Sequence, residues 1–142
     1  MTPRVLLVDD DPALRRALVR LLSLGADVTV VESRERAEQQ LALHEAGHET
    51  GAFDVVLSDV DLGGDDGLAL AAHVQRAHPA LYERFVLMTC EPEGGRFAEA
   101  LETLGRPVLR KPFTAAEFFE LAERLLSPAT ATIGSPATAT GD

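Results

Sequence analysis

Five short hydrophobic runs alternate with helix-like segments along this chain, and this alternation constrains the fold more than any other feature. The runs cover residues 4–8, 28–31, 53–58, 85–88 and 107–110. The first is aliphatic at nearly every position, which indicates a strand buried on both faces, as in a parallel sheet. The fifth begins with Pro107, which suits an edge strand because proline donates no hydrogen bond to a neighbour.

A helix is predicted after each run. The third and fourth helices cover about residues 66–77 and 96–104. The residues expected to begin or end helices are Asp11 and Pro12 at the start of the first, Gly25 at its end, Ser33 at the start of the second, and the capping box of Thr114 and Glu117 at the start of the last. Five β-α units in this order predict an α/β fold, with a doubly wound parallel sheet and helices on both faces.

Composition narrows the class of protein. The 142 residues carry a net charge of −10, so we expect no sequence-independent binding to nucleic acid, which needs clustered Lys and Arg. No hydrophobic run approaches the length of a membrane span, and the single cysteine, Cys90, excludes an intrachain disulfide. A cytoplasmic protein without membrane contact is expected. A Ser-Pro-Ala-Thr-Ala-Thr motif occurs twice after residue 126, which predicts one domain over residues 1–126 and a disordered tail over 127–142.

Polar residues stand where the predicted strands end. They are Asp9, Asp10 and Asp11 after the first strand, Asp59 after the third, Thr89 after the fourth and Lys111 after the fifth. The carboxyl ends of parallel strands share one edge, where ligands bind, so these residues are expected to converge. Clustered carboxylates need a cation, and hard oxygen ligands favour Mg²⁺. A nearby ammonium and hydroxyl suit a bound phosphoryl group, and a carboxylate there can act as its nucleophile.

These residues and their order resemble the receiver domain of two-component response regulators. The matching stretches are residues 5–12, 54–59, 66–67, 88–89 and 111–113, and the similarity extends over residues 4–126. The resemblance implies the flavodoxin-like strand order 2-1-3-4-5. It also implies a protein that is not a conventional enzyme, but a phosphoacceptor that assists its own phosphorylation and dephosphorylation.

The resemblance implies specific roles at the site and specific partners. Asp59 accepts the phosphoryl group from a histidine kinase or phosphotransfer protein, and this switches a surface that binds an unknown output protein. The resemblance also implies that Mg²⁺ is ligated by Asp10, Asp59 and the backbone carbonyl of Asp61, and that Asp9 contacts the ion through metal-bound water. It implies that the phosphoryl oxygens are bound by Thr89 and Lys111. Pro112 would fix the peptide bond after the lysine, which is often cis in this family.

Some positions depart from the family pattern. Val108 stands where an aromatic residue is usual, which removes an aromatic rotamer switch and leaves output to the segment after Thr89 and to the helix near residues 96–104. Cys90 replaces a smaller residue beside the phosphoryl site. Asp61 adds negative charge at the mouth of the crevice and is expected to slow entry of anionic donors or to alter how water is placed.

Two other functions compete with the phosphoacceptor. A degenerate receiver would bind partners without phosphorylation, and Val108 keeps that alternative open. A haloacid-dehalogenase-type phosphohydrolase would use Asp59 and Asp61 as its Asp-x-Asp motif, but in that family this motif follows the first strand and the acidic pair comes last. The chain is expected to be a stand-alone receiver or a fragment of a hybrid kinase, because no segment after residue 126 resembles an output domain.

Overall fold

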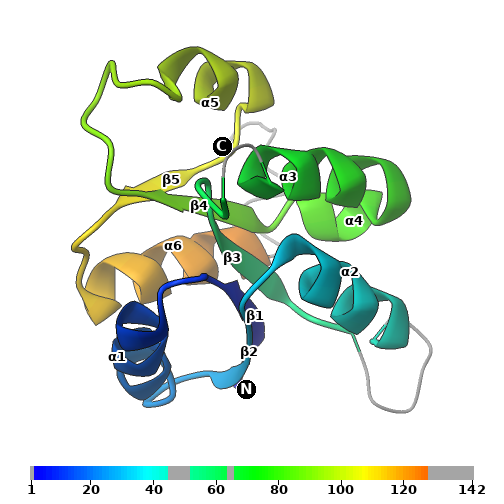
Figure 1. The fold of residues 1–142 in the computed structure, drawn as a ribbon. Helices are drawn as coiled ribbons and strands as arrows, with labels where there is room; N and C mark the ends of the chain where they lie inside the picture. The colour runs from blue at the N-terminus through cyan, green and yellow to red at the C-terminus, as the bar shows by residue number, and fades with distance from the viewer. Residues whose placement is uncertain (1, 45–51, 64–65, 128–142) are drawn as a thin grey trace, which may run out of the picture.

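The computed structural model describes residues 2–44, 52–63 and 66–127, which form a parallel sheet with helices on both faces (Figure 1). The strands are β1 (Arg4–Val8), β2 (Asp27–Val31), β3 (Val55–Asp59), β4 (Phe85–Thr89) and β5 (Val108–Arg110). They lie in the order β2-β1-β3-β4-β5, and every neighbouring pair is parallel. The predicted flavodoxin-like α/β fold is confirmed.

Six helices occur in the described residues. They are α1 (Pro12–Leu22), α2 (Arg34–Leu43), α3 (Asp66–Ala77), α4 (Pro79–Tyr82), α5 (Ala98–Leu104) and α6 (Ala115–Leu126). The predicted N-terminal caps of α1, α2 and α6 are present at Asp11, Ser33 and the Thr114–Glu117 capping box. These side chains accept hydrogen bonds from backbone N–H groups that the first turn leaves without a helical partner.

Three details differ from the sequence prediction. The assignment of Gly25 as the end of α1 is wrong, because α1 ends at Leu22 with Ser23 as its C-cap. Gly25 instead leaves room for an aromatic ring, since a Cβ there would lie 3.1 Å from Phe119. Strand β3 begins at Val55, two residues later than predicted, and the carboxylate of Asp54 just before it accepts a hydrogen bond from the backbone N–H of Arg4 at 2.7 Å. The four-residue helix α4 was not predicted.

The hydrophobic core lies in two clusters, one on each face of the sheet. Leu6 and Val8 of β1 face the cluster covered by α2, α3, α4 and α5, whereas Val5 and Leu7 face the cluster covered by α1 and α6. All four side chains are fully buried. Successive residues of a strand point to opposite faces, so a strand covered on both faces needs an unbroken aliphatic run.

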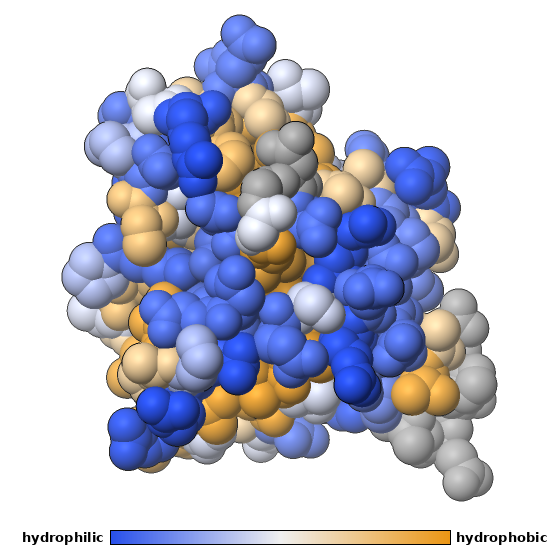
Figure 2. All heavy atoms as spheres, in the orientation of Figure 1, coloured by the Kyte–Doolittle hydropathy of each residue, from blue (hydrophilic) through white to orange (hydrophobic). Residues whose placement is uncertain are grey.

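The order of the strands also locates a crevice. Strand β1 lies between β2 and β3, because the chain runs from β1 to β2 on one side and then crosses to β3 on the other side of β1. Such a switch point opens a crevice at the carboxyl ends of the strands. Hydrophilic residues cover most of the face shown in Figure 2, where hydrophobic ones appear in small patches. Within the described ranges, no helix is long and apolar enough to cross a membrane. The predicted tail, apart from Ser127, lies outside the described residues, as do residues 45–51 and 64–65.

Candidate functional site

Three carboxylates gather at the carboxyl ends of β1 and β3. Asp9 and Asp10 follow β1 directly, and Asp59 is the last residue of β3. One carboxylate oxygen from each residue lies within 4.8 Å of the other two. Asp9 is 0% exposed and Asp59 is 7% exposed, whereas Asp10 is exposed to solvent. The topology therefore places two buried acidic groups and one exposed one around a single point.

Lys111 joins the two buried carboxylates. Its Nζ donates to Oδ2 of Asp59 at 2.7 Å and to Oδ2 of Asp9 at 3.1 Å, and its side chain is 8% exposed. Its backbone N–H donates to the carbonyl of Thr89 at 2.8 Å, which fixes it beside the end of β4. The peptide bond from Lys111 to Pro112 is cis. One ammonium group thus faces two carboxylates, which leaves an excess of negative charge.

Burial and this ion-pair network change two pKa values. Burial raises the pKa of Asp59 above its ordinary value, and the hydrogen bonds from Lys111 and from the backbone of Asp61 offset this only in part. Burial lowers the pKa of Lys111, but the hydrogen bond and charge of Asp59, followed by those of Asp9, outweigh it and raise that pKa. Lys111 is therefore firmly cationic, while ionised Asp59 is destabilised in the absence of another cation.

Thr89 ends β4 on the rim of the same crevice and is 1% exposed. Its Oγ1 accepts the backbone N–H of Glu91 at 3.0 Å, which leaves the hydroxyl proton available to a ligand.

 The crevice has a volume of about 290 Å³. Its lining includes Asp10, Asp59, Asp61, Thr89, Cys90, Glu91, Phe97 and Lys111. The structure therefore places all but one of the predicted site residues in the lining of this crevice. The exception is Asp9, which is buried and contacts Lys111.

The donor set fits a hard divalent cation. The three clustered groups are all carboxylates, and oxygen ligands of this kind suit Mg²⁺. Backbone N–H groups hold two of them in place, because Asp11 donates to Oδ1 of Asp9 at 2.9 Å and Asp61 donates to Oδ1 of Asp59 at 3.0 Å. Asp10, Asp59 and, through water, Asp9 are the residues that would hold the ion. Ligation by the backbone carbonyl of Asp61 stays a prediction.

Sequence reasoning missed two residues near the crevice. Gly67, in the first turn of α3, packs so closely on the end of β3 that a Cβ there would lie 2.2 Å from the carbonyl oxygens of both Asp59 and Val60. The guanidinium of Arg96 forms an ion pair with Asp61 across the gap between two loops. The Asp66-Gly67 pair was visible as a motif, but its packing was not. The position of Arg96 depends on the path of its loop, for which the sequence gives no signal.

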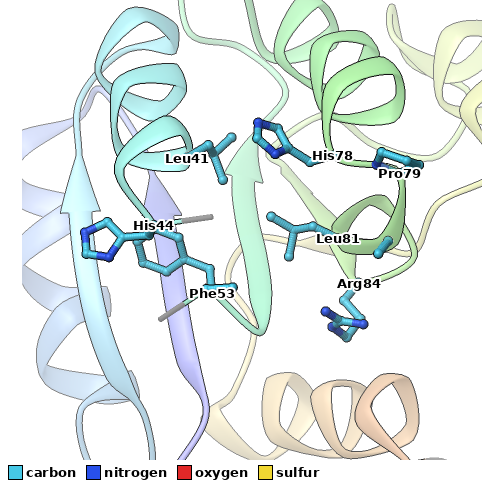
Figure 3. A pocket seen from close by; sticks show the side chains of 9 residues that line it. Leu41, His44, Phe53, His78, Pro79, Leu81 and Arg84 are labelled. Atoms are coloured by element: carbon cyan, nitrogen blue, oxygen red, sulfur yellow. The ribbon is translucent and has the colours of Figure 1, made fainter. Parts of the chain in front are cut away.

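A second pocket has different chemistry and lies at the opposite edge of the sheet (Figure 3). It is bordered by Phe53 and Arg84, which precede β3 and β4, and by His44 and His78. The ring of His44 lies 5.0 Å from that of Phe53. Its described lining contains no carboxylate, so it lacks the oxygen ligands found at the carboxyl ends of the strands.

The match to a known family agrees with this geometry. A model of the response regulator receiver domain matches residues 5–123. The chain belongs to this family. That match supports the receiver interpretation of Asp59 over the Asp-x-Asp phosphohydrolase alternative.

Curated relatives include bacterial response regulators. The chain is 37% identical to the response regulator protein FleR of Pseudomonas aeruginosa over 125 residues, which is 87% of this receiver and 24% of FleR. It is 34% identical to the DNA-binding transcriptional regulator NtrC of Escherichia coli over 123 residues, again 87% of this chain and 24% of that protein. The chain thus spans about a quarter of the length of these relatives.

Solved structures show the same fold. The signal receiver domain of an HD domain-containing protein from Pseudomonas fluorescens is 26% identical, with a TM-score of 0.72 over 88% of this chain and 87% of that one. The beryllofluoride-activated DrrB receiver domain is 21% identical, with a TM-score of 0.68 over 89% of this chain and 98% of that one. The second similarity concerns the fold alone.

Proposed function

We propose that this receiver accepts a phosphoryl group on Asp59 from a histidine kinase or phosphotransfer protein. The observation that carries the proposal is the contact of the Asp59 carboxylate with Lys111 beside Asp9 and Asp10. A carboxylate held among cationic groups can attack phosphorus while its own charge and that of the incoming phosphoryl group are neutralised.

Asp59, Lys111 and Thr89 have different roles in the proposed phosphoryl transfer. A carboxylate oxygen of Asp59 forms the new bond to phosphorus, and the bond from phosphorus to the donor nitrogen breaks, with its electron pair remaining on the donor. Lys111 neutralises charge on the phosphoryl oxygens, and the hydroxyl of Thr89 donates to one of them. When bound, Mg²⁺ supplies further charge neutralisation and orients the oxygens. Asp10 and Asp59 would hold it.

Phosphorylation is proposed to change a protein-binding surface formed by α5, β5 and α6. Thr89 and Lys111 lie next to this surface, because Thr89 precedes the segment leading to α5 and Lys111 follows β5. Val108 of β5 packs partly buried against the core cluster. It has no aromatic ring to reorient, so the signal would pass through the backbone after Thr89. A cytoplasmic location stays a prediction from the sequence.

The test is the intact mass of the protein after incubation with acetyl phosphate, with Mg²⁺ or with a chelator. One phosphoryl adduct that requires Mg²⁺ and is absent from Asp59→Asn is expected. If neither an adduct nor binding of beryllofluoride is observed, the protein is a degenerate receiver that binds partners without phosphorylation, the alternative that Val108 keeps open.

A further inference from the structure

Arg96 bridges the two loops that form the mouth of the phosphoacceptor crevice. Its Nη2 lies 2.5 Å from Oδ2 of Asp61, in the segment after β3, and its Nε lies 3.2 Å from Oε2 of Glu91, in the segment after β4. Both carboxylates line the crevice. Each stands two residues beyond a site residue, Asp59 or Thr89, so the bridge joins the two segments that leave the site at the mouth of the crevice.

Further contacts hold this bridge in place. The guanidinium of Arg96 stacks over the ring of Phe97, with 4.5 Å between its Cζ and the ring centroid. Arg110 donates from Nη1 to the carbonyl of Glu91 at 3.1 Å. Phe97 lines the crevice, whereas Arg96 does not, which places the guanidinium on the rim rather than in the opening.

We propose that Arg96 is a positioning residue that admits anionic phosphoryl donors by neutralising the acidic mouth of the crevice. This inference rests on the proposed function of Asp59. Asp61, Glu91 and Arg96 together carry a charge of −1, and without Arg96 they would carry −2 around the path that a donor must take. The Arg96 side chain is 58% exposed, so its charge also faces an approaching anion.

The test compares the rate of adduct formation with acetyl phosphate in four proteins. Arg96→Gln is expected to react roughly fivefold to tenfold more slowly than wild type at low salt. The difference should shrink as salt is raised towards about 1 M, where the Debye length is near 3 Å. The double variant Arg96→Gln/Asp61→Asn restores the charge of −1 and should recover most of the rate. Arg124→Gln, in the last turn of α6, makes the same change in net charge away from the crevice and should react like wild type.

Two results would overturn the inference. A faster Arg96→Gln protein would show that the side chain blocks entry, and a rate equal to wild type at every salt concentration would show that it has no effect on entry. If wild type forms no adduct and binds no beryllofluoride, the proposed function fails separately. If it forms no adduct but binds beryllofluoride, the proposed function stands and the role of Arg96 is still tested. Beryllofluoride affinity, measured by fluorine NMR, then gives the same comparison without a chemical step. The order of the four proteins should be the same, and equal affinities would contradict the role of Arg96.

Discussion

The ammonium group of Lys111 lies 2.7 Å from the carboxylate of Asp59 and 3.1 Å from that of Asp9, with all three side chains at most 10% exposed. This contact stabilises two buried negative charges with one positive charge. The net charge of the crevice therefore depends on the ammonium group of Lys111. Removing either this positive charge or one of the negative charges should alter both the free energy of unfolding and the affinity for a metal ion.

Removing Lys111 is expected to destabilise the metal-free receiver. Lys111→Met keeps most of the apolar stem but leaves Asp9 and Asp59 buried without their shared cation, which typically costs about 3–5 kcal/mol. Mg²⁺ should then raise the stability of the variant more than that of wild type, because it replaces part of the missing charge. Urea unfolding with Mg²⁺ and with a chelator measures both effects. Equal stability of the two metal-free proteins would contradict this role.

Removing the charge of Asp59 is expected to have the opposite effect. The pKa of Asp59 is raised in the folded protein above its ordinary 3.8, so the ionised carboxylate opposes folding. In the presence of a chelator, Asp59→Asn should be more stable than wild type above the folded pKa. This advantage should decrease as pH falls through the folded pKa and vanish below about 3.8. Chemical unfolding across this pH range provides the measurement, and a less stable variant at neutral pH would argue against a crowded acidic pocket.

Asp10 and Asp11 offer a matched comparison for metal binding. Asp10 belongs to the carboxylate cluster, whereas the Asp11 side chain accepts hydrogen bonds from the backbone at the start of α1. Saturating Mg²⁺, at about 100 times its Kd, should stabilise wild type by about 2.7 kcal/mol. Asp10→Asn should lose most of this gain. Asp11→Asn should keep it, since asparagine is also a good cap. Thermal unfolding with and without Mg²⁺ distinguishes them, and equal losses would remove Asp10 from the ligand set.

Gly67 should tolerate no side chain. A Cβ in Gly67→Ala would lie 2.2 Å from two carbonyl oxygens at the end of β3, so α3 or Asp59 must move. We expect a loss of about 1–3 kcal/mol or more, together with slower adduct formation. Gly105→Ala is the control, because φ is +65° there, no atom lies within 4 Å of its Cβ, and the residue does not line the crevice. It should cost about 1 kcal/mol through backbone strain and leave the reaction rate unchanged. Similar rates for both variants would show that the close packing is not needed for the reaction.

The features that were predicted correctly from the sequence are those that follow from general rules of strand burial, sheet topology and helix capping. Unbroken aliphatic runs predicted buried strands, and the shared edge of parallel strands predicted that Asp9, Asp59 and Lys111 meet. Short-range chemistry also predicted the caps at Asp11 and Ser33. Such features depend on neighbouring residues or on the topology of the whole sheet.

Other features depend on details that no local pattern contains. Helix α4 has four residues, too few to show hydrophobic periodicity. Gly25 was predicted to end α1, but its lack of a side chain instead leaves room for the ring of Phe119, which is distant in the sequence. The pairing of Arg96 with Asp61 joins loops 35 positions apart and depends on how each loop turns.

The contact between Asp9 and Lys111 joins residues 102 positions apart. A ribosome must therefore synthesise nearly the whole domain before the second of these residues exists. A nascent chain that has folded only its first strands holds the acidic residues without their cation. The complete cluster of Asp9, Asp59 and Lys111 thus forms only late in synthesis, when β5 brings Lys111 to the crevice.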